Sequence, residues 1–169
     1  MRYVDALIGR VLDDLERRRL LERTVVIITS DHGMEFNESG QGFKGHGTAF
    51  SDYQVHTPFV LRWPGRAPGR VARRTSHNDL APTVLVELFG CTNPPADYAS
   101  GQSLFSDAQW DWLITVSPSD FAVLEPDQVT IVYPSGNEVR DQHYHLIQHP
   151  RLSRDKLRAA IEEMRRFSN

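Results

Sequence analysis

An acid, an imidazole and a glycine stand together where an apolar run ends. Residues 25–30 read Val-Val-Ile-Ile-Thr-Ser, which is typical of a buried strand, and Asp31, His32 and Gly33 follow directly. Burial of unpaired polar groups is costly, so two such side chains at a strand end need a partner. A divalent cation bound by both side chains is one explanation, and a hydrogen-bonded structural pair is the other. These residues alone leave both open.

A second histidine strengthens the metal interpretation. His46 lies between Gly45 and Gly47, and flanking glycines allow a backbone to approach an ion or anion closely. Lys44 is a natural partner for an anion, whereas a solvated loop histidine is the alternative for His46. The imidazoles favour Zn²⁺ or Mn²⁺ over Ca²⁺ or Mg²⁺. A catalytic metal site generally needs three protein ligands and an open position, so these residues form part of a site.

The other polar candidates have simpler explanations. His143 and His145 alternate with apolar residues, which is typical of an exposed strand face, although with His149 their spacing resembles a ligand cluster. Glu35 and Glu38 lie in a glycine-rich loop, where they could serve as an acid or a base, although loop acids are usually solvated. No residue is assigned as catalytic, because the sequence has neither a Gly-x-Ser-x-Gly elbow nor a phosphate-cradling loop.

The hydrophobic pattern predicts an α/β portion, residues 1–107, and a small α+β portion, residues 108–169. The first begins with an amphipathic helix whose apolar residues recur at helical spacing from Val4 to Leu15. Its other predicted elements are strands 24–30 and 58–63, a long loop 31–57, and a helix 75–90 with Asp79 in a capping role. The second portion has predicted strands 112–116, 121–124, 129–133 and 139–147 and a helix 153–167.

Composition bounds the function classes. The chain has 169 residues and a formal net charge of −3 with mixed signs, which gives no electrostatic basis for binding nucleic acid. No apolar run approaches the roughly 20 residues that span a bilayer, so we expect the chain itself to be soluble. Cys91 is the single cysteine, which excludes an internal disulfide.

Five sequence blocks together resemble the C-terminal half of the sulfatase and alkaline-phosphatase superfamily, and their order is most like the YejM-type inner-membrane sulfatase-like proteins. The blocks are residues 24–33, 45–47, 57–65, 79–83 and 101–105. The resemblance implies the C-terminal part of an alkaline-phosphatase-like α/β sandwich, followed by a small antiparallel sheet with a C-terminal helix.

The same resemblance implies a metal-dependent hydrolase or transferase acting on sulfate or phosphate esters. Asp31 and His32 match the family's late metal-ligand pair, and His46 matches a residue that binds a second metal or the substrate's anionic group, with Lys44 beside it. The Asp-His pair favours the phosphoesterase and phosphoethanolamine-transferase side. The family's nucleophile and early metal ligands belong to an N-terminal half that these residues do not include, so we expect this polypeptide alone to be inactive.

The resemblance also suggests partners. We expect the N-terminal half of the same fold to be one, lipid or lipopolysaccharide headgroups to be another, and a homodimer to form if a sheet edge is left open. The longer parent protein would lie in the inner membrane with this part facing the periplasm. The alternative function is a sulfatase-like scaffold that binds lipid or protein partners and regulates envelope lipid or lipopolysaccharide synthesis.

Overall fold

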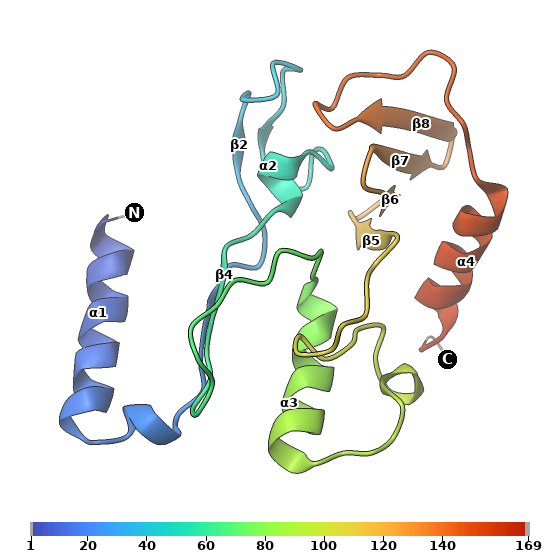
Figure 1. Ribbon diagram of the computed structural model, residues 1–169. Helices are drawn as coiled ribbons and strands as arrows, with labels where there is room; N and C mark the ends of the chain where they lie inside the picture. The colour runs from blue at the N-terminus through green and yellow to red at the C-terminus, as the bar shows by residue number, and fades with distance from the viewer. Residues whose placement is uncertain (1, 168–169) are drawn as a thin grey trace. The chain divides into compact units, whose positions relative to one another are not determined.

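A computed structural model describes residues 2–167 (Figure 1). Contacts between residues divide the chain into two compact units, which are described separately. The first contains the residues up to Gly33 together with His56–Val71, and the second contains Met34–Val55 together with the residues from Ala72 onward. The expected division into residues 1–107 and 108–169 follows the sequence pattern rather than these contacts, and it stays a prediction.

The first unit consists of a helix and a two-stranded sheet. Helix α1 (Arg2–Arg17) is followed by a 3-10 turn (Leu21–Arg23) and by strand β1 (Val26–Thr29), as the hydrophobic pattern predicts. Strand β4 (Phe59–Arg62) pairs with β1 in antiparallel register. The sequence predicts a buried strand here, and this prediction is wrong. Among the described residues β1 pairs with β4 alone, and the side chains of β1 are half-buried or exposed.

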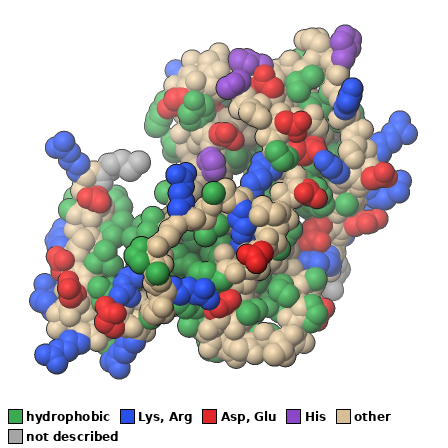
Figure 2. All heavy atoms as spheres, in the orientation of Figure 1, with side chains coloured by type: hydrophobic (Ala, Val, Ile, Leu, Met, Phe, Trp, Pro, Cys, Tyr) green, Lys and Arg blue, Asp and Glu red, His purple; other side chains and the backbone are tan. Residues whose placement is uncertain are grey.

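Helix α1 leaves its apolar face uncovered. None of its described residues is buried, and Val4, Leu7 and Val11 are 57%, 38% and 59% exposed. Leu7, Val11 and Leu15 line a shallow groove along the helix. Figure 2 shows hydrophobic side chains gathered along one side of α1 and charged side chains along the other. An amphipathic helix normally buries such a stripe.

The second unit begins with the stretch that was predicted to be an irregular loop. It contains a short hairpin of β2 (Glu35–Phe36) and β3 (Lys44–Gly45), followed by one helical turn, α2 (Asp52–Val55). Within this segment the side chains of Ser51 and Gln54 are buried although both are polar. Buried polar side chains of this kind require hydrogen-bond partners, and both donate to the carboxylate of Glu35.

A capping box starts the next helix. Ser76 accepts a hydrogen bond from the Asn78 amide, and the Asp79 carboxylate accepts one from the Ser76 amide at 2.8 Å. A 3-10 turn (His77–Asp79) leads into α3 (Leu80–Phe89), which ends at Gly90 with φ +64°. The predicted end at Gly90 is confirmed. The cap is Ser76, and Asp79 is its reciprocal acid.

Asp79 also joins this helix to a later segment. Its Oδ1 accepts hydrogen bonds from the Gln102 amide at 2.9 Å and from the Trp110 indole at 3.3 Å, and the Asp79 side chain is fully buried. Gly101 lies so close to the helix start that a Cβ there would be 1.9 Å from the Asn78 carbonyl oxygen. The segment that follows a short 3-10 turn (Pro95–Asp97) is therefore locked onto the start of α3.

A four-stranded antiparallel meander and a helix complete the unit (Figure 1). The strands are β5 (Leu113–Val116), β6 (Phe121–Leu124), β7 (Gln128–Tyr133) and β8 (Gly136–Asp141), and the helix is α4 (Arg154–Arg165). Ala122 and Ile131 form its core with Tyr144, Ala49 and Phe50. The antiparallel sheet and the C-terminal helix are thus confirmed.

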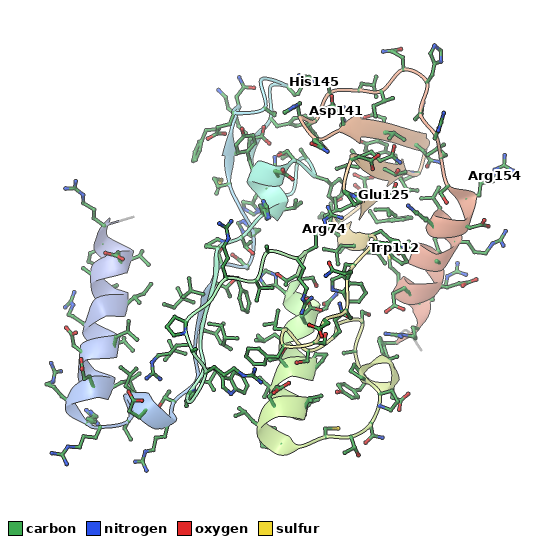
Figure 3. The ribbon with its side chains drawn as sticks, in the orientation of Figure 1. Arg74, Trp112, Glu125, Asp141, His145 and Arg154 are labelled. Carbon is green, nitrogen blue, oxygen red and sulfur yellow. The ribbon has the colours of Figure 1, made fainter. Side chains whose placement is uncertain are left out.

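The last strand ends earlier than predicted. The pattern of residues 139–147 resembles a strand, but β8 stops at Asp141, whose Oδ1 accepts the amides of His143 at 2.9 Å and His145 at 2.8 Å. Figure 3 shows Asp141 and His145 at the same turn. The expected strand-face placement of the two histidines is wrong, because this carboxylate closes a turn at their position.

Polar contacts hold the turn between β6 and β7. Arg74 donates hydrogen bonds to the carbonyl oxygens of Leu124 at 2.8 Å and Glu125 at 3.0 Å (Figure 3). The Glu125 carboxylate pairs with Lys156 of α4 and accepts a hydrogen bond from Gln128 at 2.7 Å. Glu125 is only 9% exposed, and a buried charge needs a partner. The Lys156 ammonium supplies it.

Candidate metal and anion site

Asp31 and His32 turn toward each other immediately after β1. The Asp31 carboxylate accepts a hydrogen bond from the His32 amide at 3.0 Å, and its Oδ2 lies 3.5 Å from His32 Nε2. Nδ1 of His32 lies 2.8 Å from the Gly33 carbonyl oxygen. A carbonyl can only accept, so Nδ1 carries a proton, and in the neutral form of the ring Nε2 is then the nitrogen that can donate an electron pair to a metal.

This arrangement suits two ligands of one ion. Ligand atoms about 2.0–2.2 Å from a tetrahedral Zn²⁺ lie roughly 3.3–3.6 Å apart, which includes the observed 3.5 Å between Oδ2 and Nε2. The Nδ1 contact to a backbone carbonyl is the support that metal-binding imidazoles usually have. Asp31 is exposed and His32 half-buried, so solvent can reach both.

Lys44 and His46 occupy a short segment of the second unit. Both side chains are exposed, and Gly45 and Gly47 have φ values of +97° and +66°. Such values favour glycine, which explains why this residue type flanks the histidine. The two pairs, Asp31 with His32 and Lys44 with His46, belong to different units. Within residues 2–167, no group of three or more His, Cys, Asp or Glu side chains is arranged to hold a metal.

Glu35 organises the segment that contains Lys44 and His46. Its side chain is 0% exposed, so the expectation of a solvated loop acid is wrong. Oε2 accepts hydrogen bonds from Ser51 Oγ at 2.6 Å and Gln54 Nε2 at 3.0 Å, and Oε1 accepts from Ser39. Gln54 Oε1 in turn accepts the amides of Thr48 and Ala49, both at 3.1 Å. One buried carboxylate thus fixes the chain on both sides of His46.

Acid should weaken this network. Burial raises the pKa of Glu35, but the hydrogen bonds from Ser39, Ser51 and Gln54 together outweigh it, so the pKa lies below its usual value of 4.5. The carboxylate therefore contributes stability above that value, and the contribution is lost as the pH falls through the folded-state pKa. Chemical denaturation at a series of pH values from neutral to about pH 3 should show the difference in unfolding free energy between wild type and Glu35→Gln shrinking as the pH falls. A gap independent of pH would contradict this prediction.

Tyr144 joins the meander to the same segment. It is 4% exposed, and its hydroxyl oxygen accepts the Phe50 amide at 2.8 Å. Its ring meets Phe43 edge to face with centroids 5.6 Å apart, and the Arg140 guanidinium lies 4.7 Å from the Tyr144 ring centroid. Burial raises the pKa of Tyr144 to about 12, so the phenol is neutral at physiological pH.

Sequence reasoning missed Glu35 and Tyr144 as organising residues. The partners of Glu35 include Ser51, 16 positions later, and Tyr144 meets Phe50 across 94 positions. Neither separation leaves a local pattern. The polar residues in and beside α2 are the one local signal that could have indicated a buried hydrogen-bond partner such as Glu35.

Comparison with known proteins identifies the family. A family model described as Sulfatase matches residues 1–90, just over half of the chain. The chain belongs to the sulfatase family. The predicted resemblance to the sulfatase and alkaline-phosphatase superfamily is thereby confirmed, and so is the α/β fold class.

Individual relatives of this sulfatase-family chain are considerably longer. Inner membrane protein YejM of Salmonella typhimurium is 27% identical over 166 residues, which cover 97% of this chain and 28% of YejM. A choline-sulfatase of Rhizobium meliloti is 36% identical over 88 residues, covering 52% of this chain and 16% of that protein. The chain thus spans less than a third of these relatives.

The fold is that of a solved hydrolase. A phosphonate monoester hydrolase from Silicibacter pomeroyi superimposes with a TM-score of 0.71 at 20% identity, covering 96% of this chain and 38% of the hydrolase. At this identity the likeness shows the fold, so the chain has the fold of part of that hydrolase. None of the helices within residues 2–167 has the length and apolar character required to cross a bilayer.

Proposed function

We propose that this chain supplies part of the metal- and anion-binding site of a sulfatase-family hydrolase or transferase that acts on phosphate or sulfate esters. Asp31 and His32 are the proposed metal ligands, and Lys44 and His46 the proposed residues for the anionic group or a second ion. The observation that supports the proposal best is the 3.5 Å separation of Asp31 Oδ2 and His32 Nε2, with Nδ1 held by the Gly33 carbonyl. Zn²⁺ or Mn²⁺ is the proposed metal.

Each residue has a distinct chemical role in this proposal. A bound divalent ion would stabilise the negative charge that develops on the transferred phosphoryl or sulfuryl oxygens. Asp31 supplies an anionic oxygen ligand and His32 a neutral nitrogen ligand. The Lys44 ammonium offers a positive charge to the ester's anionic oxygens. None of these four residues is a nucleophile, so we propose that the chain alone does not turn over such esters.

Metal binding tests the ligand pair. Isothermal titration of the chain with Zn²⁺ and with Mn²⁺ should show saturable binding that weakens at least tenfold in His32→Ala, because one of two ligands is removed. His149→Ala is the control, since it removes an exposed imidazole that is not one of the proposed ligands. Equal affinity in wild type and His32→Ala would contradict the assignment. Absence of binding in both proteins would leave two explanations, a site that needs the N-terminal half of the fold, or the alternative function, a sulfatase-like scaffold that binds lipid or protein partners. The same titration on a longer protein that includes the N-terminal half would decide between them.

The uncovered face of α1 bears on the partners. Because Val4, Leu7 and Val11 are exposed and the relatives are longer, we propose that residues outside 1–169 of a longer protein cover this stripe. Pairing of two copies and contact with lipid or lipopolysaccharide headgroups stay predictions. A periplasmic position in an inner-membrane protein is proposed from the similarity to YejM.

A further inference from the structure

The segment that contains Lys44 and His46 is held at both ends by Tyr144, which lies in the turn that follows β8. Phe43 and Phe50 border the segment, and Tyr144 contacts both of them. The rings of Phe43 and Tyr144 lie edge to face, and the Phe50 amide donates a hydrogen bond to the Tyr144 hydroxyl. All of these residues belong to the second unit. Between the two contacts, the chain passes through Gly45 and Gly47 at positive φ.

The contact at Phe50 is buried and specific. The Phe50 amide donates to Tyr144 Oη at 2.8 Å, and the two residues are 6% and 4% exposed. A buried amide needs an acceptor, because one without a partner costs free energy. The Tyr144 hydroxyl therefore does more than fill the core, since a phenylalanine ring could fill the same space without accepting this amide.

The contact at Phe43 is reinforced by Arg140. Its guanidinium carbon lies 4.7 Å from the Tyr144 ring centroid and 5.9 Å from that of Phe43. Arg140 also donates to the Tyr144 carbonyl oxygen at 3.0 Å and pairs with Glu138 at 2.9 Å. One cation on β8 thus holds both rings in their mutual orientation.

Tyr144 adopts a backbone conformation that the meander must impose. Its φ of +67° is uncommon for a bulky residue other than glycine. Asp141 holds the turn, because its carbonyl oxygen accepts the Tyr144 amide at 2.9 Å and its carboxylate accepts the amides of His143 and His145. The hydrogen bond from the His145 amide is the main cause that lowers the pKa of Asp141. Strain of this kind persists where the surrounding structure requires it, often at functional sites.

We propose that Tyr144 is a positioning residue for the anion-binding segment, fixing both ends of residues 43–50 so that Lys44 and His46 are presented in one conformation. The proposal rests on the proposed function of those two residues. Glycines at 45 and 47 give the segment wide conformational freedom, and holding its ends reduces the entropy that ligand binding must remove. The C-terminal meander thereby contributes to the site without contacting the ligand.

The test compares Tyr144→Phe with Tyr133→Phe in the full chain. Tyr133 is a half-buried tyrosine that packs against the same core cluster, and its hydroxyl forms a hydrogen bond with Glu138, whereas the Phe50 amide donates to Tyr144. Hydrogen–deuterium exchange of residues 43–50 and the imidazole NMR resonances of His46 report the segment's conformation directly. Titration with inorganic phosphate measures how well Lys44 and His46 are positioned to bind an anion.

Tyr144→Phe should raise exchange across residues 43–50 at least tenfold, most at the Phe50 amide, shift the His46 resonances, and weaken phosphate binding at least threefold. Tyr133→Phe should change none of these. Asp141→Ala, which releases the turn while keeping the phenol, should reproduce the faster exchange. Unchanged exchange and His46 resonances in Tyr144→Phe would overturn the proposal, even if the variant is less stable. If wild type does not bind phosphate, the anion role fails, and exchange still decides the role of Tyr144.

Discussion

Replacing Gly101 by alanine should destabilise the second unit by about 3 kcal/mol or more, because the new Cβ has no room. It would lie 1.9 Å from the Asn78 carbonyl oxygen and 2.6 Å from the Asp79 amide nitrogen. Both are backbone atoms at the start of α3, so no flexible side chain can move away. The Gln102 amide would lose its 2.9 Å hydrogen bond to Asp79 if the segment shifts. Thermal unfolding should show a midpoint lower by roughly 6–12 °C.

Gly69→Ala is the control for this prediction. Apart from its two chain neighbours, none of the residues that the structure describes has a heavy atom within 4 Å of a Cβ built at Gly69, and its φ is outside the positive region. The substitution should therefore change stability by less than about 0.5 kcal/mol. If Gly101→Ala is as stable as Gly69→Ala, the segment containing Gln102 does not pack against the start of α3 as described.

The elements that the sequence predicts well are those with a local pattern. Helix α1 has apolar residues at helical spacing, and α3 ends at a glycine in the left-handed conformation. The start of α3 is harder, because Ser76 and Asp79 both have the chemistry of a cap, and the structure uses them reciprocally. Composition alone cannot assign which of the two is the N-cap.

The end of β8 shows how a local pattern misleads. His143, Tyr144, His145 and Leu146 alternate polar and apolar as a strand does, yet the carboxylate of Asp141 closes a turn around them. The hydrogen bonds of one aspartate outweigh the alternation. That outcome depends on packing of Tyr144 in the core, which no window of the sequence contains.

The candidate site also contains some residues that a local pattern predicts and others that it does not. Asp31 and His32 are adjacent and follow a strand, so their pairing could be predicted, and the structure shows them 3.5 Å apart. Glu35 could not be recognised, since its acceptor role depends on Ser51 and Gln54, which are 16 and 19 residues away. The proposed binding residues are visible in local motifs, whereas the residues that hold the segment of Lys44 and His46 in place are visible only in the fold.

Glu35→Ala should be the second strongly destabilising substitution, with a cost of about 3–4 kcal/mol. The side chain is fully buried, and its removal leaves Ser51 Oγ and Gln54 Nε2 without their acceptor. Each buried donor left unpaired costs about 1–3 kcal/mol. Gln54 would then no longer be oriented to accept the amides of Thr48 and Ala49, so exchange of those amides should also rise. Urea denaturation measures the free energy, and hydrogen exchange measures the segment.

Glu38→Ala separates this effect from loss of a nearby charge. Glu38 lies three positions later in the same loop, is exposed, and accepts the Phe36 amide. Solvent can replace that acceptor, so the substitution should cost less than about 1 kcal/mol. Because both variants remove one carboxylate from the same hairpin, a large difference between them must come from burial and hydrogen bonding. Similar losses in the two variants would refute the assignment of Glu35 as the residue that organises the segment bearing Lys44 and His46.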